Sequence, residues 1–458
     1  TWYHQWRTGA YLQHWNNDFK YQDPWVLNSP WIQQRHNNGK SAGSIMNWSA
    51  TRGMHRFSAH GWYVQRDTKL PATMGSELSG TAEQSDRQLR GVAEYVYQGN
   101  TNWFRAALRS QDFLQSYNDA GVWNIHSRMH AQSHQLALEG TKQCNDVWQL
   151  GAQVQAMQQQ AISSNLEGEG MRVFQYATAA GVKRMTDRSH LHVDARADMR
   201  WNRIYWSGTL SNTSFFTLGE WQMETRWNAG RRVRLPDLNE LFWSPGGNPG
   251  LHPEEAWTGY FGQAATRKVN GTSIQMLCGM TGSDVQNWIQ WTPDSTGVWS
   301  AKNISHVQSI QPECSIQWEY KMRDSMFVSL RANAQYTVCQ RVSSVGEDYQ
   351  MIYTPQMQWG CSANWKWKRW MMNLSTQYQS RRFTDEQNTE SLALPAQSLY
   401  QFSIAYQGSL RSADCSWAFG VDNLTNVAYQ SVRGYPMPGR VFEISCQINI
   451  PHHEHHQP

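Results

Sequence analysis

The chain has 458 residues, of which 40% are hydrophobic and 17% are charged, and its 40 basic and 36 acidic side chains nearly balance. This balance argues against a nucleic-acid-binding protein and against a polybasic protein of the membrane surface. No run of 18 or more apolar residues occurs, so the sequence predicts no transmembrane helix. Seven cysteines are scattered without a CxxC pair. We expect them to be lone thiols that act as small hydrophobic residues, and neither a disulfide framework nor a zinc site.

Apolar and polar residues alternate in segment after segment along the chain. The alternation is clear in 148–156, 326–338, 372–379, 399–407 and 441–450. A strand places successive side chains on opposite faces, so each segment predicts a ribbon with one apolar and one polar face. No long segment shows the 3.6-residue period of an amphipathic helix. Repeated about twenty times, the pattern is typical of a membrane-spanning β-barrel, whose strands satisfy each other's backbone groups.

The connections between these segments come in two lengths that interleave along the chain. Short ones occur at 52–55, 98–102, 142–145, 186–188, 321–324, 366–369 and 410–413. Long ones occur at 16–41, 67–86, 232–254, 290–303, 380–396 and 423–439. Outer-membrane barrels have short periplasmic turns and long extracellular loops. We therefore predict an all-β fold, a transmembrane antiparallel up-and-down β-barrel of about 20–22 strands over residues 1–450, followed by a His-rich tail at 451–458.

The expected size of the barrel bears on its function, because a barrel of about 22 strands encloses a lumen that needs a plug. The polar positions of the strands are predicted to face this lumen, among them Gln149, Gln153, Asn333, Gln335, Gln377 and Gln447. The 25 tryptophans are explained in part by aromatic girdles at the two membrane interfaces.

Three segments carry information beyond periodicity. They read RLPDLNELFWSPGGNPGLHPE at 234–254, DNLTNVAY at 422–429 and GYPMPGR at 434–440. In combination they resemble the barrel of TonB-dependent outer-membrane receptors. In that family an arginine and a proline precede an LNELF-like stretch and an NP-L-PE box, and N-L-x-x-x-x-Y and PGR precede the closing strand. The resemblance covers the C-terminal half of the chain, whereas residues 1–200 fit as generic barrel strands.

We interpret the motif residues as loop-shaping and barrel-closing features, since prolines break ladders and glycines allow tight backbone. Arg234 is a candidate partner for Glu240 or for a carboxylate of the lumen. Pro312 is expected to interrupt a strand ladder, because it lacks a backbone N–H. The motif residues are Arg234, Pro236, Asn239, Glu240, Asn248, Pro249, Asn423, Gly439 and Arg440.

Within the family, NWIQWTP at 287–293 followed by GVWS at 297–300 looks most like the cobalamin-receptor branch of Bacteroidetes-type bacteria. Aromatic and amide side chains of the long loops are the expected ligand contacts, because they suit stacking and hydrogen bonding to a bulky planar ligand. The alternative for each is an interface girdle or loop packing. The candidates are Trp25, Trp31, Trp243, Asn248, Trp288, Trp291, Trp299 and Tyr435.

The resemblance implies TonB-dependent active import of a scarce, bulky nutrient across the bacterial outer membrane, with cobalamin or another corrinoid first and a siderophore or haem as the alternative. It implies the TonB–ExbB–ExbD complex, outer-membrane lipid and a small-molecule substrate as partners. It also implies a plug domain, which we expect outside this chain, and a surface lipoprotein is a further candidate. Nucleic acid is not expected as a partner.

A passive porin-like channel is the alternative from another functional class. An enzyme is not expected, because no histidine is spaced as the base of an activated nucleophile. No metal site and no required cofactor are predicted. Calcium in the extracellular loops, for example at Asn16–Asp18 with Asp23, stays open, although calcium needs six to eight oxygen ligands.

Overall fold

The computed structural model describes residues 2–23, 26–75, 80–121, 125–164, 171–243, 246–293, 299–322, 326–342, 348–410 and 413–449. None of the helices in these ranges is long or apolar enough to cross a membrane. In chain order the elements are β1 (Tyr3–Asn16), β2 (Phe19–Gln22), β3 (Trp31–Gln34), β4 (Asn38–Arg52), β5 (His55–Leu70), β6 (Ala82–Gln98), β7 (Asn102–Asp119), β8 (Ile125–Gln143), β9 (Trp148–Ser163), β10 (Met171–Thr186), β11 (Ser189–Arg200), β12 (Arg203–Leu218), β13 (Trp221–Arg234), α1 (Leu238–Phe242), β14 (Glu254–Val269), β15 (Thr272–Pro293), β16 (Trp299–Met322), β17 (Met326–Tyr336), β18 (Val338–Arg341), β19 (Tyr349–Gln350), β20 (Met357–Trp367), β21 (Trp370–Gln379), η1 (Glu390–Leu392), β22 (Gln397–Leu410), β23 (Ala413–Asp422), β24 (Gln430–Val432), β25 (Tyr435–Pro436) and β26 (Val441–Asn449).

One antiparallel sheet contains 22 of these strands, and its neighbours follow chain order from the β1–β4 ladder to the β23–β26 ladder. β18 continues β17 beside β16, and β19 lies beside β18 just before β20. The 22 strands less these 2 continuations leave 20 positions across the sheet. The prediction of about 20–22 antiparallel strands in sequential order is therefore confirmed. β2–β3 and β24–β25 form two small sheets within long loops.

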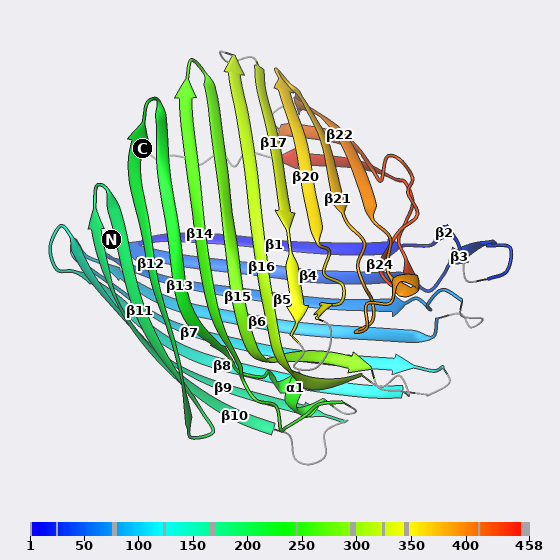
Figure 1. Cartoon of the computed structure of the whole chain (residues 1–458), viewed down its shortest axis with the longest axis horizontal. Helices are drawn as coiled ribbons and strands as arrows, with labels where there is room; N and C mark the ends of the chain where they lie inside the picture. Colours follow the sequence, from blue (N-terminus) through cyan, green and yellow to red (C-terminus); the bar gives the residue numbers. More distant parts are fainter. Residues whose placement is uncertain are drawn as a thin grey trace.

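The large sheet curls strongly. Figure 1 shows the blue and cyan strands β4–β10 crossing behind the green and yellow strands β14–β17. Among the described residues no ladder joins β1 to β26, so these strands form the two edges of the curled sheet. Their side chains are exposed along almost their whole length. The predicted sequential topology is present, whereas closure into a complete barrel is not seen.

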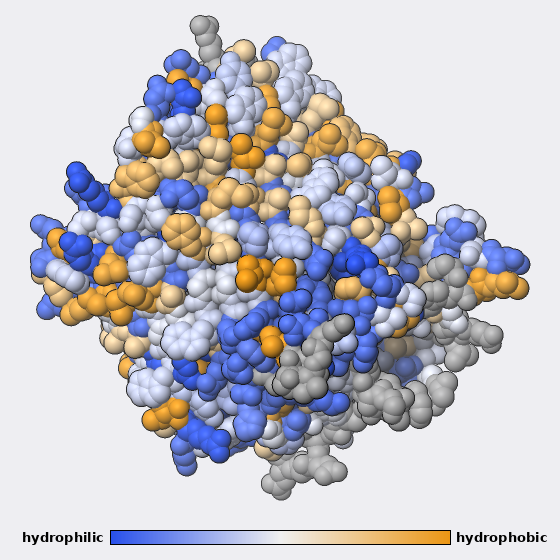
Figure 2. Space-filling view, viewed as in Figure 1, coloured by the Kyte–Doolittle hydropathy of each residue, from blue (hydrophilic) through white to orange (hydrophobic). Residues whose placement is uncertain are grey.

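The two faces of the sheet differ as the alternation predicts. On the outer face, Leu138 pairs with Val154, and both side chains are exposed. On the inner face a polar groove of about 480 Å³ is lined by Asn333, Gln335 and Gln377 together with neighbouring amides. Figure 2 shows apolar side chains over the upper strands and hydrophilic ones gathered around α1 and the strand ends near it. The wall thus has an apolar outside and a polar lumen side, as a strand period of two requires.

Long and short connections gather at opposite ends of the strands, with one exception. The connection between β11 and β12 lies at the long-loop end but consists of Trp201 and Asn202 alone. Both residues have positive φ, 50° and 60°. A two-residue turn with positive φ at both positions matches the right-handed twist of a hairpin. The strict interleaving of short and long connections is therefore wrong at this point.

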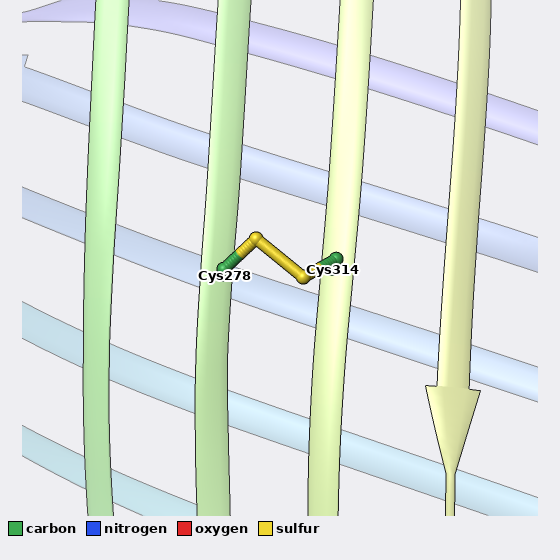
Figure 3. Close-up of a disulfide and its surroundings, with 2 residues drawn as sticks. All are labelled: Cys278 and Cys314. Atoms are coloured by element: carbon green, nitrogen blue, oxygen red, sulfur yellow. A yellow bond between two sulfur atoms is a disulfide. The ribbon is translucent and has the colours of Figure 1, made fainter.

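The prediction that all seven cysteines are lone thiols is wrong. Cys278 of β15 and Cys314 of β16 form a disulfide (Figure 3). The two residues lie directly opposite each other in the antiparallel ladder. Directly opposed residues have neighbouring Cβ atoms, which brings two thiols within bonding reach. The other five, Cys144, Cys339, Cys361, Cys415 and Cys446, are free.

Pro312 interrupts one ladder and not the other. β16 runs from Trp299 to Met322 through Pro312, which pairs with Met280 of β15. On the opposite side, pairing with β17 stops at Glu313 and pairing with β18 starts at Ile310. The missing N–H of proline accounts for a break on one side of a strand, because a strand residue donates to only one neighbour. The break separates β17 from β18 at the long-loop end.

Candidate functional site

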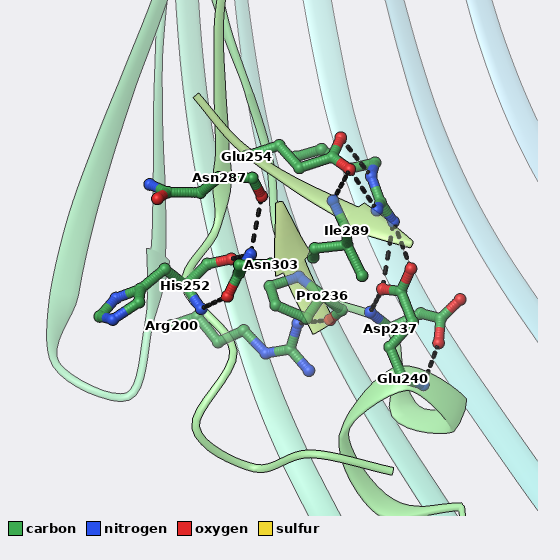
Figure 4. A network of polar contacts seen from close by, with 10 residues as sticks. Arg200, Pro236, Asp237, Glu240, His252, Glu254, Asn287, Ile289 and Asn303 are labelled. Carbon is green, nitrogen blue, oxygen red and sulfur yellow. Dashed lines mark hydrogen bonds and ion pairs between the residues drawn. The ribbon is translucent and has the colours of Figure 1, made fainter. Parts of the chain in front are cut away.

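The loop between β13 and β14 is fixed by one arginine at its start (Figure 4). Arg234 Nη1 donates to both carboxylate oxygens of Glu240, at 3.0 and 3.1 Å. Its Nε and Nη2 donate to the two oxygens of Glu254, each at 2.7 Å. The expected pairing with Glu240 is therefore present, and Glu254 is a second partner. A planar guanidinium that faces two carboxylates fixes the angle between the loop and the next strand.

The short helix α1 begins with a capping box. The Asp237 carboxylate accepts the Glu240 N–H at 2.8 Å, and the Glu240 carboxylate accepts the Asp237 N–H at 2.8 Å. Glu240 is buried, with 7% of its surface exposed. A buried carboxylate is tolerated only when it is paired and hydrogen-bonded, and Arg234 and Asp237 together meet this need.

The same loop packs onto the ends of β15 and β16 through an apolar cluster. Leu241 and Leu251 of the loop meet Ile289 and Ala301 of the strands, and all four are buried. The Glu254 carboxylate also accepts the Ile289 N–H at 2.7 Å. Charge and apolar contact therefore hold the loop against the same two strands.

Asn303 of β16 completes the attachment. Its amide accepts the His252 N–H at 2.8 Å and donates to the backbone oxygens of His252 and Asn287 at 3.0 and 2.7 Å. On the other side of the loop, the buried Arg200 donates to the Pro236 oxygen at 2.6 Å. We call residues 234–254 with Ile289, Ala301 and Asn303 the Arg234 platform.

A second set of loops gathers around another arginine. Arg382 is 6% exposed and donates to the backbone oxygens of Gln430 and Ser431, at 2.9 and 3.3 Å. Burial lowers the pKa of the Arg382 guanidinium from its ordinary value, and the nearby Tyr353 opposes this effect. Its backbone pairs with Leu394. We call residues 380–394 with 423–440 the Arg382 loop cluster.

Within this cluster the motif residues act on backbone groups. Asn423 has a φ of 48°, and its amide bonds both the N–H and the oxygen of Val427, at 2.9 and 2.8 Å. Asn426 accepts the Arg440 N–H at 2.8 Å, and a Cβ added at Gly439 would lie 2.5 Å from the Asn426 oxygen. These residues therefore shape the loop that leads into β26.

A pocket of about 720 Å³ lies between the Arg234 platform and the Arg382 loop cluster, and we call it the mouth pocket. Trp299, Lys302 and Asn303 line one side, and Arg341, Tyr353 and Glu386 are among the residues on the other. Arg341 at the end of β18 and Glu386 of the Arg382 loop cluster form an ion pair at 3.2 Å. Tyr353 has a φ of 55°, and its N–H is held by the Phe383 oxygen at 2.8 Å. An exposed indole, cations and carboxylates in one concave site suit a bulky, polar small molecule.

The predicted ligand residues are dispersed, and only Trp299 lines the mouth pocket. Trp291 packs on the apolar cluster of the platform, and Trp243 is the C-cap of α1. Trp288 of β15 is half-buried and lies opposite Ile304 of β16. The side-chain amide of Asn248 donates to the Ala301 oxygen at 3.3 Å. Trp31 on β3 and Tyr435 on β25 are exposed elsewhere, and Trp25 and the His-rich tail lie outside the described residues. A role as ligand contacts stays a prediction for all eight.

Sequence reasoning missed Lys302, Arg341, Tyr353 and Glu386. Arg341 and Glu386 are 45 residues apart and carry no local pattern that would join them. For calcium, the described residues hold no group of three or more His, Cys, Asp or Glu side chains placed to bind a metal ion. Asp23 is fully buried and accepts the Gly75 N–H at 2.8 Å. Calcium in the loops stays a prediction.

The chain is similar to known transporters in sequence and in fold. No protein-family model matches it. It is 24% identical over 202 residues to the vitamin B12 transporter BtuB of Photobacterium profundum, and this match spans 40% of the chain but only 31% of that relative.

Solved structures resemble the chain over nearly its full length. The copper transporter OprC has a TM-score of 0.74 at 13% identity, with 97% of this chain and 76% of that chain covered. The ferric citrate transporter FecA has a TM-score of 0.71 at 13% identity, with 96% of this chain and 73% of that chain covered. The FrpB iron transporter from Neisseria meningitidis has a TM-score of 0.73 at 10% identity, with 98% of this chain and 77% of that chain covered. The fold is therefore that of TonB-dependent receptor barrels.

Proposed function

We propose that this chain forms the wall of a TonB-dependent importer in the bacterial outer membrane and that its substrate is cobalamin or another corrinoid. The substrate binds in the mouth pocket at the long-loop end. The TonB–ExbB–ExbD complex then uses the proton-motive force to move a plug that occupies the polar lumen. The wall itself catalyses no covalent reaction.

The mouth pocket is the observation that carries this proposal. It combines an exposed indole at Trp299 with charged groups at Lys302, Arg341 and Glu386, at the end of a wall with a transporter fold. Such a mixture suits a large ligand with both flat and amide-bearing parts. The similarity to BtuB favours a corrinoid over an iron chelate. Haem is disfavoured, because no histidine lies between Pro236 and Asn248.

Equilibrium binding of cyanocobalamin to the purified full-length protein tests the substrate. Loss of a stacking indole costs roughly 1–2 kcal/mol, so Trp299→Ala is expected to weaken binding about tenfold. Trp206→Ala is the matched control, since Trp206 is also exposed but lies on the outer face of β12. Absence of cyanocobalamin binding by the wild type, or equal binding by both variants, contradicts the assignment. Binding of a ferric siderophore or haem instead supports the alternative substrates of the same class.

A passive porin is the second candidate, favoured by the water-compatible amides of the lumen groove at Asn333, Gln335 and Gln377. Single-channel conductance of the full-length protein in planar bilayers separates the two functions. Gated import predicts a closed channel at rest, because the lumen is filled. A steady, large open current supports the porin and contradicts the importer.

A further inference from the structure

The outer wall of β6–β10 carries a group of basic side chains next to its apolar band. Arg87 of β6, Arg128 of β8 and Arg172 of β10 are exposed near the long-loop ends of their strands. His126, His130 and His134 alternate with inward residues on β8, so they share the outer face with Arg128. We call these six residues the outer basic patch.

The register places the patch on neighbouring strands. Arg87 is opposite Leu114 of β7, and Leu114 is opposite His130 of β8. Arg172 of β10 is opposite Gln160 of β9 and donates to its side-chain oxygen at 3.2 Å. The patch therefore extends across five consecutive strands of one curved face.

Positive charge exceeds negative charge within the patch. Asp112 is the carboxylate at its centre, and it accepts from His130 and Gln132, each at 2.8 Å. Across the ranges that the structure describes, Arg87, Arg128 and Arg172 form no ion pair with a carboxylate. Among the described residues these three charges are thus not neutralised by an acid, and guanidinium groups bind phosphate in a bidentate manner.

The apolar band begins directly beside the patch on the same strands. Leu136 and Leu138 continue the outer face of β8 beyond His134, and Val154 of β9 lies opposite Leu138. All three apolar side chains are exposed. A molecule that contacts both regions is therefore amphipathic, with a negatively charged head and an apolar tail.

A second part of the outer wall, on β14–β16, offers a comparison. On β15 and β16, Asp284 accepts from His306 and Gln308 at 2.9 and 2.7 Å, which repeats the chemistry of Asp112. There, however, the nearby Arg231 is paired with Glu255 at 2.7 Å. The arginine near Asp284 thus has a carboxylate partner, whereas the β6–β10 face combines the histidine–aspartate contact with three guanidinium groups that have no carboxylate partner among the described residues.

We propose that the outer basic patch binds the phosphate groups of a phosphorylated glycolipid in the outer leaflet, with its acyl chains against Leu136, Leu138 and Val154. The proposal rests on the outer-membrane location and not on the substrate of the mouth pocket. Arginines bind the phosphates, and imidazole and amide groups bond the sugar oxygens. The bound lipid anchors this side of the wall at a fixed depth.

The test measures lipid retention by the full-length protein. The protein is placed in phosphatidylcholine nanodiscs with a small share of bisphosphorylated lipid A, released into mild detergent, and its bound lipid is counted by native mass spectrometry. The R87Q/R128Q/R172Q triple variant is expected to retain at least about tenfold less lipid A, because it loses three cationic side chains, each of which contributes to the attraction to an anionic lipid surface. Lipid A without phosphates is expected to show no difference between wild type and variant.

The K142Q/R184Q double variant is the matched control, because both residues are exposed on β8 and β10 but lie at the short-turn end. Control retention equal to the wild type supports the patch. Equal retention by the triple variant, an equal loss in the control, or equal retention of dephosphorylated lipid A overturns the proposal. Circular dichroism verifies that the variants fold, and unchanged cyanocobalamin affinity separates this result from the proposed import function.

Discussion

The Arg234 platform and the Arg382 loop cluster both centre on an arginine, but the two guanidinium groups meet different acceptors. Arg234 faces two carboxylates, Glu240 and Glu254, and its side chain is 44% exposed. Arg382 is almost fully buried and donates to backbone oxygens at 430 and 431. One arginine neutralises acids that the fold has buried, whereas the other joins two loops without any charge partner among the described residues.

The difference shows which loops are fixed to the wall. The platform is attached to the strand ends at Ile289, Ala301 and Asn303. The Arg382 loop cluster is attached to the short strand β19 through a Gln350–Asn388 contact and to the β5–β6 loop through a Met74–Gly434 contact, both at 2.7 Å. The mouth pocket therefore has one side built on the long strand β16 and one side built on loops and the end of the short strand β18. We expect substitutions in the Arg234 platform to lower the free energy of unfolding more than substitutions in the Arg382 loop cluster.

The largest effect is expected below the platform, at the Cys278–Cys314 disulfide. A cross-link over 36 residues removes loop-closure entropy worth roughly 3–4 kcal/mol in the chain-entropy model. The C278S/C314S double variant should lose up to about this much unfolding free energy in urea titrations of the reconstituted protein. C144S is the control, because Cys144 is exposed and free. Equal stability of the double variant and the control contradicts the expectation.

Arg234→Met should cause the next largest loss of stability, because it leaves the buried Glu240 without its cation. Removal of one partner of a buried pair costs about 3 kcal/mol. Hydrogen exchange of the Ile289 amide reports the loss directly, since this N–H is bonded to Glu254. The R234M/E240Q/E254Q variant should regain part of the protection, because no uncompensated charge remains. An unchanged exchange rate in Arg234→Met means that the platform is not held by this arginine.

Gly246→Ala tests how closely the platform approaches the pocket. Gly246 has a φ of 116°, and an added Cβ would lie 1.9 Å from the Trp299 oxygen. We expect a cost of about 2 kcal/mol and faster exchange of the Ala301 amide, which is bonded to the Gly246 oxygen. In Gly219→Ala the φ is also positive, at 59°, but the space is open. That control should lose no more than about 1 kcal/mol, and a larger loss there than at Gly246 contradicts the account.

The smallest effect is expected from Arg382→Met. It removes two hydrogen bonds to backbone oxygens and keeps the apolar stem, so about 1–2 kcal/mol is lost, mainly within the loops. Faster hydrogen exchange at 430–436 with little change at Ile289 is the expected pattern. Arg381→Met is the control, because Arg381 is exposed and pairs with the exposed Glu390. A loss as large as that of Arg234→Met removes the contrast between the two regions.

The strands of the wall were predictable, because apolar and polar residues alternate with a period of two along each strand. The edges of the strands, the polar lumen at Asn333 and Gln335, and the Arg234–Glu240 pair all follow from short-range patterns. The disulfide was not predictable, because it depends on the register that brings Cys278 opposite Cys314, and the long connection predicted at 290–303 does not fix that register as a two-residue turn would. Pro312 was only half understood, since its effect depends on which neighbour its N–H would face.

The mouth pocket was the least predictable part. Part of its lining comes from loops whose positions depend on Arg382, Asn388 and Gly434, and sequence neighbours do not encode such contacts. Aromatic composition found Trp299 but gave the same weight to Trp291, which packs inside the platform. Burial, and not residue type, separates the two.

The most direct test of active corrinoid import is uptake of radiolabelled cyanocobalamin by cells that carry the full-length protein as their sole cobalamin importer. The account predicts uptake that stops when the proton-motive force is collapsed with an uncoupler and that falls about tenfold in Trp299→Ala at limiting substrate. Uptake that continues at the same rate after uncoupling would contradict the central claim, because a passive channel needs no energy.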